Sequence, residues 1–174
     1  MKVYLENKWK TKVDSNSPKE IWATELIKDR LGNVAIQKDS NGKPFILNSS
    51  SFINWSHNDD TLIYVLSEQG KVGIDIEKDD LIYNEHLYSW ILHKDEIQKI
   101  KEGTTFSEIW TRKEAILKCT GEGINENMAH FSSYQKMRFT VKTIFMNNLC
   151  ISICSEFDEK IEFLMDYTIS SSIE

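Results

Sequence analysis

Hydrophobic and polar residues alternate with a helical period in some segments of the chain and with a strand period in others. Residues 17–20 (Ser-Pro-Lys-Glu) carry the N-cap, the first-turn proline and the glutamate of a capping box. An apolar row follows, so the pattern predicts a helix over 18–31. Short apolar runs at 33–37 and 45–47 flank the turn-forming residues 40–44 and predict a hairpin.

The middle of the chain continues this mixture of strands and helices. The runs 61–66 and 72–76 are predicted to pair as strands of one sheet. The helical period then returns over 85–100, with a break near His93 and a stop at Gly103.

The last third of the chain begins with a second helix signal. Residues 105–108 (Thr-Phe-Ser-Glu) match a capping box and open a helix that Gly121 ends. Runs at 139–145 and 149–154 flank two asparagines and predict a hairpin, and 161–168 is predicted to be the last strand. Both halves combine helices with antiparallel strands, so the predicted fold class is α+β.

Composition and charge restrict the class of protein. With 174 residues, 40% hydrophobic and 28% charged, we expect one compact unit of two α+β halves, 1–83 and 84–174. The net charge of −6 argues against nucleic acid or a membrane surface as a partner. No signal-like or membrane-spanning segment stands out, which predicts a cytoplasmic protein, and we expect a monomer. The three cysteines lack C-x-x-C spacing and are expected to be reduced and buried.

Two acidic residues lie on the strand-like run 72–77 (Val-Gly-Ile-Asp-Ile-Glu). A period of two places Asp75 and Glu77 on one face and turns the isoleucines toward the core. Two carboxylates on one face repel unless a cation lies between them, and Gly73 leaves room for a ligand or another backbone. The alternative is an edge strand that presents its acids to water.

A second charged motif lies on the helix expected after residue 105. Trp110, Glu114 and Lys118 are four residues apart and therefore lie in one row. An ordinary ion pair on a helix surface is the alternative interpretation. Together with the acids on the strand, however, Glu114 and Lys118 can hold a hard cation such as Mg²⁺ and a phosphate that shares it.

Two short motifs carry little information by themselves. The motif N-W-S-H at 54–57 offers Ser56 and His57 as donors to phosphate oxygens. As a hydrolase pair they are unconvincing, because the sequence contains no G-x-S-x-G elbow. The motif G-K-P at 42–44 is, in isolation, a turn with a surface lysine, Lys43.

The order of the motifs resembles that of the Sfp-type 4′-phosphopantetheinyl transferases. The matching elements are G-K-P at 42–44, N-x-S-H at 54–57, G-I-D-I-E at 73–77, W-T-R-K-E-A-x-x-K at 110–118 and G-x-G at 121–123. The resemblance covers roughly residues 18–125. It implies two similar α+β halves in a pseudo-twofold arrangement, with coenzyme A bound in the cleft between them.

The resemblance implies a metal site formed by acids of the strand motif and the helix motif, with lysines of the helix motif beside it. Asp75, Glu77 and Glu114 would be the ligands of Mg²⁺. Lys118 would contact the phosphates of coenzyme A during catalysis, and Lys113 would be a further cationic contact.

The resemblance also implies contacts at the other end of the coenzyme. Lys43 and His57, together with Ser56, would bind its phosphate-bearing nucleotide end. Glu96 matches a glutamate of the family and would help to deprotonate the acceptor serine.

The implied function is transfer of 4′-phosphopantetheine from coenzyme A to a serine of an apo acyl or peptidyl carrier protein, releasing adenosine 3′,5′-bisphosphate. The alternatives are a non-catalytic homologue that binds coenzyme A or a carrier protein, and a metal-dependent phosphohydrolase. Because such carriers are acidic, we expect docking on segment 94–142, whose 9 basic and 7 acidic residues give a net charge of +2. Arg112 and Lys113 would be the steering cations.

Overall fold

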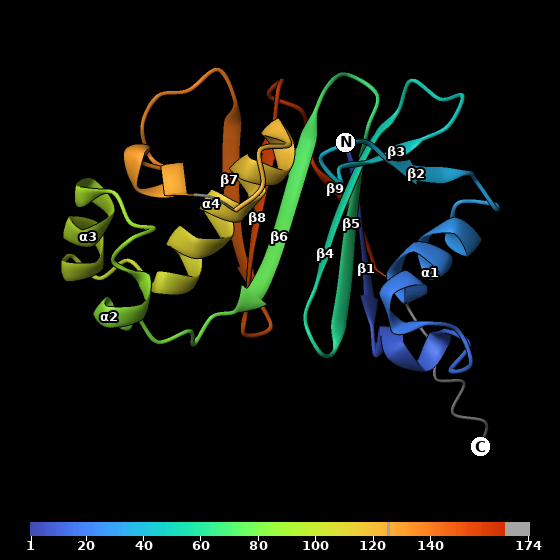
Figure 1. Cartoon of the computed structure of the whole chain (residues 1–174), viewed down its shortest axis with the longest axis horizontal. Coiled ribbons are helices and arrows are strands. Elements are labelled where there is room, and N and C mark those ends of the chain that lie inside the picture. The colour runs from blue at the N-terminus through green and yellow to red at the C-terminus, as the bar shows by residue number, and fades with distance from the viewer. Residues whose placement is uncertain (125, 166–174) are drawn as a thin grey trace.

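Two β-sheets packed face to face form the centre of the molecule, and helices cover their outer faces (Figure 1). The computed structural model describes residues 1–124 and 126–165. The larger sheet contains, in spatial order, β2 (Ile36–Lys38), β3 (Pro44–Ile46), β4 (Phe52–His57), β5 (Thr61–Ser67), β1 (Lys2–Asn7) and β9 (Glu162–Met165). The smaller sheet contains β6 (Val72–Lys78), β8 (Leu149–Ser155) and β7 (Thr140–Met146). The predicted α+β class is confirmed.

The two longest helices lie on opposite sides of this pair of sheets. Helix α1 (Trp22–Arg30) packs on the larger sheet through Leu26 and Ile27, and α4 (Phe106–Thr120) packs on the smaller sheet through Ala115. The other helical segments are η1 (Trp9–Lys12), η2 (Lys19–Ile21), α2 (Glu85–Tyr88), α3 (Lys94–Lys101) and η3 (Glu126–His130).

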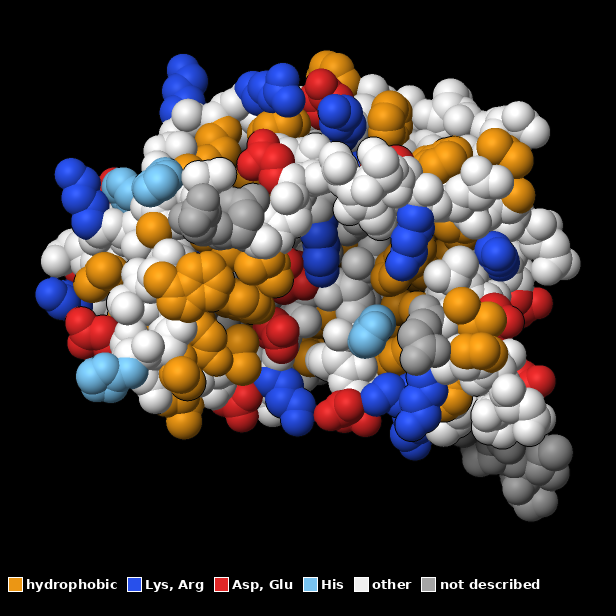
Figure 2. Space-filling view, in the orientation of Figure 1, with side chains coloured by type: hydrophobic (Ala, Val, Ile, Leu, Met, Phe, Trp, Pro, Cys, Tyr) orange, Lys and Arg blue, Asp and Glu red, His pale blue; other side chains and the backbone are white. Residues whose placement is uncertain are grey.

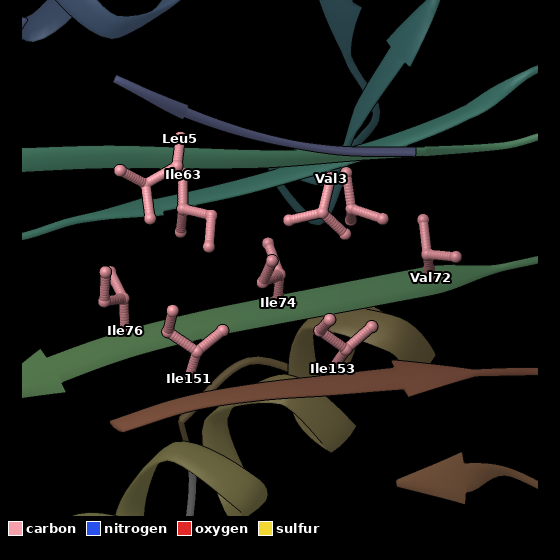
Figure 3. Packing of buried hydrophobic residues seen from close by; sticks show 9 residues of the cluster. Val3, Leu5, Ile63, Val72, Ile74, Ile76, Ile151 and Ile153 are labelled. Atoms are coloured by element: carbon pink, nitrogen blue, oxygen red, sulfur yellow. The ribbon is translucent and has the colours of Figure 1, made fainter. Parts of the chain in front are cut away.

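Apolar side chains fill the space between the two sheets. Val3 and Leu5 on β1 and Ile63 on β5 face Ile74 and Ile76 on β6 (Figure 3). Interdigitating inner faces of this kind are the usual core of a β-sandwich. Val72 faces the same core, and because side chains alternate along a strand, Asp75 and Glu77 point the other way, toward α4.

The predicted pairing of 61–66 with 72–76 is wrong. Strand β5 lies between β1 and β4 and is antiparallel to both, so neither of its edges is free for β6. Strand β6 pairs with β8 in the other sheet, where Asp75 lies opposite Ser152. The turn after β5, in which Ser67 Oγ accepts hydrogen bonds from two backbone amides, therefore carries the chain from one sheet to the other.

The helix predicted over 18–31 forms only in part. A 3₁₀ turn precedes α1, which begins at Trp22, and no side chain that the structure describes caps either start. The N-cap predicted at Ser17 is wrong, because Pro18 is at the N-cap of the 3₁₀ turn and Ile21 is at the N-cap of α1. The Ser17 carbonyl oxygen accepts a 2.8 Å hydrogen bond from Trp22 Nε1. The hairpin predicted from 33–37 and 45–47 is confirmed as β2 and β3.

The second half of the chain follows the sequence pattern more closely. His93 caps α3, and Thr105 caps α4 by accepting a hydrogen bond from the Glu108 amide at 3.2 Å. Gly121 ends α4 with a φ of 85°. Strands β7 and β8 form the predicted hairpin, and β9 lies parallel to β1. Residues 166–168 of the predicted last strand lie outside the described residues.

Two further sequence expectations concern apolar helices and cysteines. Among the described helices, none combines the length and the apolar content needed to cross a membrane. Cys119, Cys150 and Cys154 are free thiols and all are buried, as predicted.

Gly73 is the point on β6 against which α4 packs. A Cβ atom at this position would overlap Ala115 O and Cys119 N, which are backbone atoms of α4. Of the two uses that the sequence allowed for this glycine, the structure therefore shows the close approach of another backbone.

We expect Gly73→Ala to destabilise the protein by about 1–3 kcal/mol, because the α4 backbone must move to admit the methyl group. Chemical denaturation monitored by circular dichroism measures this change. An unfolding midpoint equal to that of the wild type would mean that α4 does not pack on β6 in this way.

Candidate functional site

The acidic residues of β6 point away from the sandwich core. Ile74 and Ile76 are buried between the sheets, whereas Gly73 contacts α4. Asp75 and Glu77 share the side of Gly73 because side chains alternate along the strand. Asp75 is 4% exposed and Glu77 is partly exposed. The predicted alternation along this strand is confirmed.

Helix α4 brings two more charged groups to these acids. Lys118 Nζ lies 2.6 Å from Asp75 Oδ1, and Ser56 Oγ on β4 donates a hydrogen bond to the same oxygen at 2.7 Å. Glu114, one turn before Lys118, is close enough to Asp75 and Glu77 for the three acids to repel one another. We call Asp75, Glu77, Glu114 and Lys118 the carboxylate cluster. Acidic and basic side chains meet in the hollowed middle of the face shown in Figure 2.

Burial and mutual repulsion shape the protonation of the carboxylate cluster. Burial, together with repulsion by Asp75 and against the attraction of Lys118, raises the pKa of Glu114 to about 7. Burial and repulsion by Asp75 also raise the pKa of Glu77, against the effects of Lys118 and of a hydrogen bond from Trp110. A further cation beside these carboxyl groups would therefore favour their charged forms.

The donor atoms of the carboxylate cluster suit a hard divalent cation. Asp75 Oδ2 and Glu114 Oε1 are buried and accept no hydrogen bond from the residues that the structure describes. Carboxylate oxygens are the ligands that Mg²⁺ prefers, and a cation would relieve both the repulsion and the unsatisfied oxygens. Within 1–124 and 126–165, however, no group of three acidic, histidine or cysteine side chains is already arranged to hold a metal ion. In this conformation the ammonium of Lys118 is the cation beside Asp75.

Ser56 and His57 are neighbours on β4 but point to opposite faces of the strand. Ser56 reaches Asp75, whereas the His57 ring packs against Trp9 with their centroids 4.8 Å apart. Burial lowers the pKa of His57, and the nearby Lys118 lowers it further. The structure therefore does not place these two predicted nucleotide contacts on the same face.

A groove of about 200 Å³ lies beside Lys118. Its walls include Lys43 in the turn before β3 and Trp55 on β4. Lys43 Nζ donates to three backbone carbonyl oxygens, those of Val72 (3.2 Å), Lys118 (2.6 Å) and Cys119 (2.6 Å). The predicted coenzyme contact is thus already hydrogen-bonded within the protein.

Glu96 and Lys113 form an ion pair of their own. Lys113 Nζ lies 2.9 Å from Glu96 Oε2, and both side chains are 0% exposed. Ser133 donates to Glu96 through its amide and its hydroxyl, and the His93 amide donates to it as well. Lys113 also donates to two backbone carbonyls of the segment after α4. In this conformation neither the predicted proton acceptor nor the predicted cationic contact is open to a substrate.

Of the two steering cations predicted for the docking surface, Lys113 is wrong, because its side chain is fully buried. Arg112 donates hydrogen bonds to Thr143 Oγ1 at 3.1 Å and to Ser133 O at 2.8 Å. Its guanidinium lies 4.3 Å from the centre of the Tyr134 ring. Arg112 is partly exposed and these hydrogen-bond partners carry no charge, so docking of an acidic carrier at Arg112 stays a prediction.

The site also includes two side chains for which the sequence predicted no chemical role. Asn54 Oδ1 accepts a 3.1 Å hydrogen bond from Ile74 N and so links β4 to β6, which belong to different sheets. Trp110 donates to Glu77. A strand predicted at N-W-S-H would have placed Asn54 on the same face as Ser56, and so would have identified Asn54 as part of the site.

Comparison with known proteins agrees with the motifs. Residues 71–170 match the model of the 4′-phosphopantetheinyl transferase superfamily. The chain is 32% identical over 100 residues to the 4′-phosphopantetheinyl transferase gsp of Aneurinibacillus migulanus, covering 53% of this chain and 40% of that protein. It is 30% identical over 125 residues to the 4′-phosphopantetheinyl transferase AcpT of Escherichia coli (strain K12), covering 66% of this chain and 62% of AcpT. The matched region thus spans less than two thirds of either relative.

Proposed function

Because the chain belongs to the 4′-phosphopantetheinyl transferase superfamily, we propose that it transfers 4′-phosphopantetheine from coenzyme A to a serine of an apo acyl or peptidyl carrier protein. The leaving group is adenosine 3′,5′-bisphosphate. The observation that carries the proposal is the convergence of Asp75 and Glu114 with Lys118, because diphosphate chemistry needs both metal-binding carboxylates and a cation.

The residues of the carboxylate cluster divide into two roles. Asp75, Glu77 and Glu114 would hold Mg²⁺, which when bound supplies positive charge to the diphosphate of coenzyme A. Lys118 would exchange its ion pair with Asp75 for a contact to the phosphates, since its side chain is 28% exposed. A fixed ammonium there stabilises the negative charge that grows on the leaving phosphate. Ser56 would keep the Asp75 carboxylate oriented.

We propose the groove beside Lys118 as the place for the nucleotide end of the coenzyme. Its lining offers a cation at Lys38, an amide at Asn41 and an aromatic ring at Trp55. The cation and the amide suit a phosphate, and the aromatic ring suits a base. A role for His57 at this end stays a prediction; alternation along β4 places His57 on the same face as Trp55, and Lys118 is close enough to lower the pKa of the His57 ring.

The proposed two-half architecture agrees with the arrangement of the sheets. Each sheet carries one long helix on its outer face, which supports two similar α+β units. We propose that the halves 1–83 and 84–174 exchange a strand each, because β6 lies in the sheet of β7 and β8 while β9 lies beside β1.

The proton of the acceptor serine needs a base. Glu96 stays the sequence-based candidate, but its carboxylate can reach a substrate only if its ion pair with Lys113 opens and α3 separates from α4. A stability measurement on Glu96 variants separates this role from a structural one.

The test is to incubate the protein with coenzyme A, Mg²⁺ and several apo carriers, and to measure the intact mass of each carrier. We expect at least one carrier to gain the mass of a phosphopantetheine group on its serine, and a chelator to abolish the gain. Unmodified carriers throughout would contradict the proposal.

A second candidate is a homologue that binds coenzyme A or a carrier without catalysis. The observation that favours it is the Lys118–Asp75 ion pair, which occupies one carboxylate of the proposed metal site. Calorimetric binding of coenzyme A without any mass gain would support this candidate. Release of products from coenzyme A without a carrier would instead indicate a phosphohydrolase.

A further inference from the structure

The side chain of Lys43 connects three separate parts of the fold. Its backbone lies in the turn between β2 and β3, which Asp39 fixes by accepting a 2.9 Å hydrogen bond from the Lys43 amide. Its Nζ donates to Val72 O at the start of β6 and to Lys118 O and Cys119 O at the end of α4. An ammonium has three N–H donors, so these three bonds use all of them.

The carbonyl groups at the end of α4 depend on this ammonium. The last carbonyls of a helix have no partner within the helix, and a cation near them also interacts favourably with the helix dipole. Leu117 O accepts hydrogen bonds from the amides of Gly121 and Glu122. The next two carbonyls, of Lys118 and Cys119, are the ones that Lys43 takes.

The bridge joins the two elements that carry the carboxylate cluster. Lys118, whose carbonyl Lys43 holds, places its own ammonium 2.6 Å from Asp75. Val72, which Lys43 also holds, lies three residues before Asp75 on the same strand. The three hydrogen bonds therefore fix the end of α4 relative to β6 at the position where Lys118 meets the acids.

We infer that Lys43 is a positioning residue, which holds Lys118 at the carboxylate cluster through the backbone, and that it does not bind the phosphates of coenzyme A. This inference rests on the proposed function, because it assigns Lys43 a part in phosphopantetheine transfer. A phosphate contact would require the ammonium to leave Val72 O and the two carbonyls at the end of α4, Lys118 O and Cys119 O, for which the described residues offer no other donor.

The test compares Lys43→Met with the wild type in steady-state transfer to a carrier. Methionine keeps the length and apolar stem of lysine but has no donor. We expect kcat to fall roughly 10- to 100-fold, because a misplaced catalytic group costs about this much. The KM for coenzyme A should change less than about threefold, since no phosphate contact is lost. Lys71→Met, which removes an exposed lysine just before β6, is the matched control and should match the wild type.

A rise of the KM for coenzyme A by about tenfold or more with an unchanged kcat would overturn the inference, because it is the result expected for a lost binding contact. Unchanged kcat and KM would overturn it as well. Lys43→Arg keeps a charge and several donors, so it should recover part of the lost kcat. If Lys43→Met lacks a cooperative thermal transition, Lys43→Arg is compared with the wild type instead, with a smaller fall in kcat expected.

Amide hydrogen exchange gives a readout that does not depend on activity. In Lys43→Met, the amides of Gly121 and Glu122 should exchange faster than in the wild type, while those of the central strand β5 should keep their protection. Unchanged exchange at the end of α4 would overturn the inference. If the wild type modifies no carrier, the proposed function fails, but the exchange measurement still decides whether Lys43 holds the end of α4.

Discussion

Asp75→Ala and Glu114→Ala should each lower the turnover of carrier modification by at least about 100-fold. Each substitution removes a carboxylate that the proposed metal site needs, and the loss corresponds to about 3 kcal/mol or more of transition-state stabilisation. Asp75→Ala also removes the partner of Lys118 and the acceptor of Ser56. Initial rates of carrier modification at saturating coenzyme A measure the effect.

Asp80→Ala is the matched control, because Asp80 is an exposed acid just beyond β6. Its turnover should equal that of the wild type. Calorimetry with Mg²⁺ alone should show weaker binding for Asp75→Ala and Glu114→Ala than for Asp80→Ala. Near-normal turnover of either cluster variant at saturating Mg²⁺ would remove that residue from the proposed metal site.

Local patterns predicted those parts of the fold that depend on neighbouring residues. The caps of α4 at Thr105 and Gly121 and the hairpin of β7 and β8 are set by short-range hydrogen bonds and turn chemistry, which the sequence displays. Local patterns could not predict the strand with which β6 pairs. This partner depends on which sheet edge is free, and the two edges of β5 are filled by β1 and β4, strands that the sequence pattern does not predict.

The candidate site was likewise predictable where it depends on local spacing and unpredictable where it depends on distant segments. The alternation on β6 placed Asp75 and Glu77 on one face, and the spacing on α4 placed Glu114 and Lys118 in one row. The sequence could not show which lysine and arginine side chains are already bound within the protein, because their partners lie in distant segments. Lys43 reaches carbonyls at the end of α4, about 75 residues away in the sequence.

The ion pair between Glu96 and Lys113 predicts a large loss of stability when only one partner is removed. Glu96→Gln keeps the size of the side chain but leaves the Lys113 ammonium buried without its counter-charge. Burial already lowers the pKa of Lys113, against the attraction of Glu96. We expect a loss of about 3–5 kcal/mol, or a fall in Tm of roughly 6–20 °C for a protein of this size. Thermal unfolding followed by circular dichroism measures it.

Two further variants test whether the loss of stability comes from the buried ion pair. Asp95→Asn changes the exposed neighbouring acid and should alter stability by no more than about 0.5 kcal/mol. In Glu96→Gln/Lys113→Met both charges are gone, so its loss should be smaller than the sum of the two single losses. A Glu96→Gln protein with the wild-type Tm but strongly reduced kcat would contradict the structural role. It would instead favour Glu96 as the base that accepts the serine proton, and would require α3 and α4 to separate during turnover.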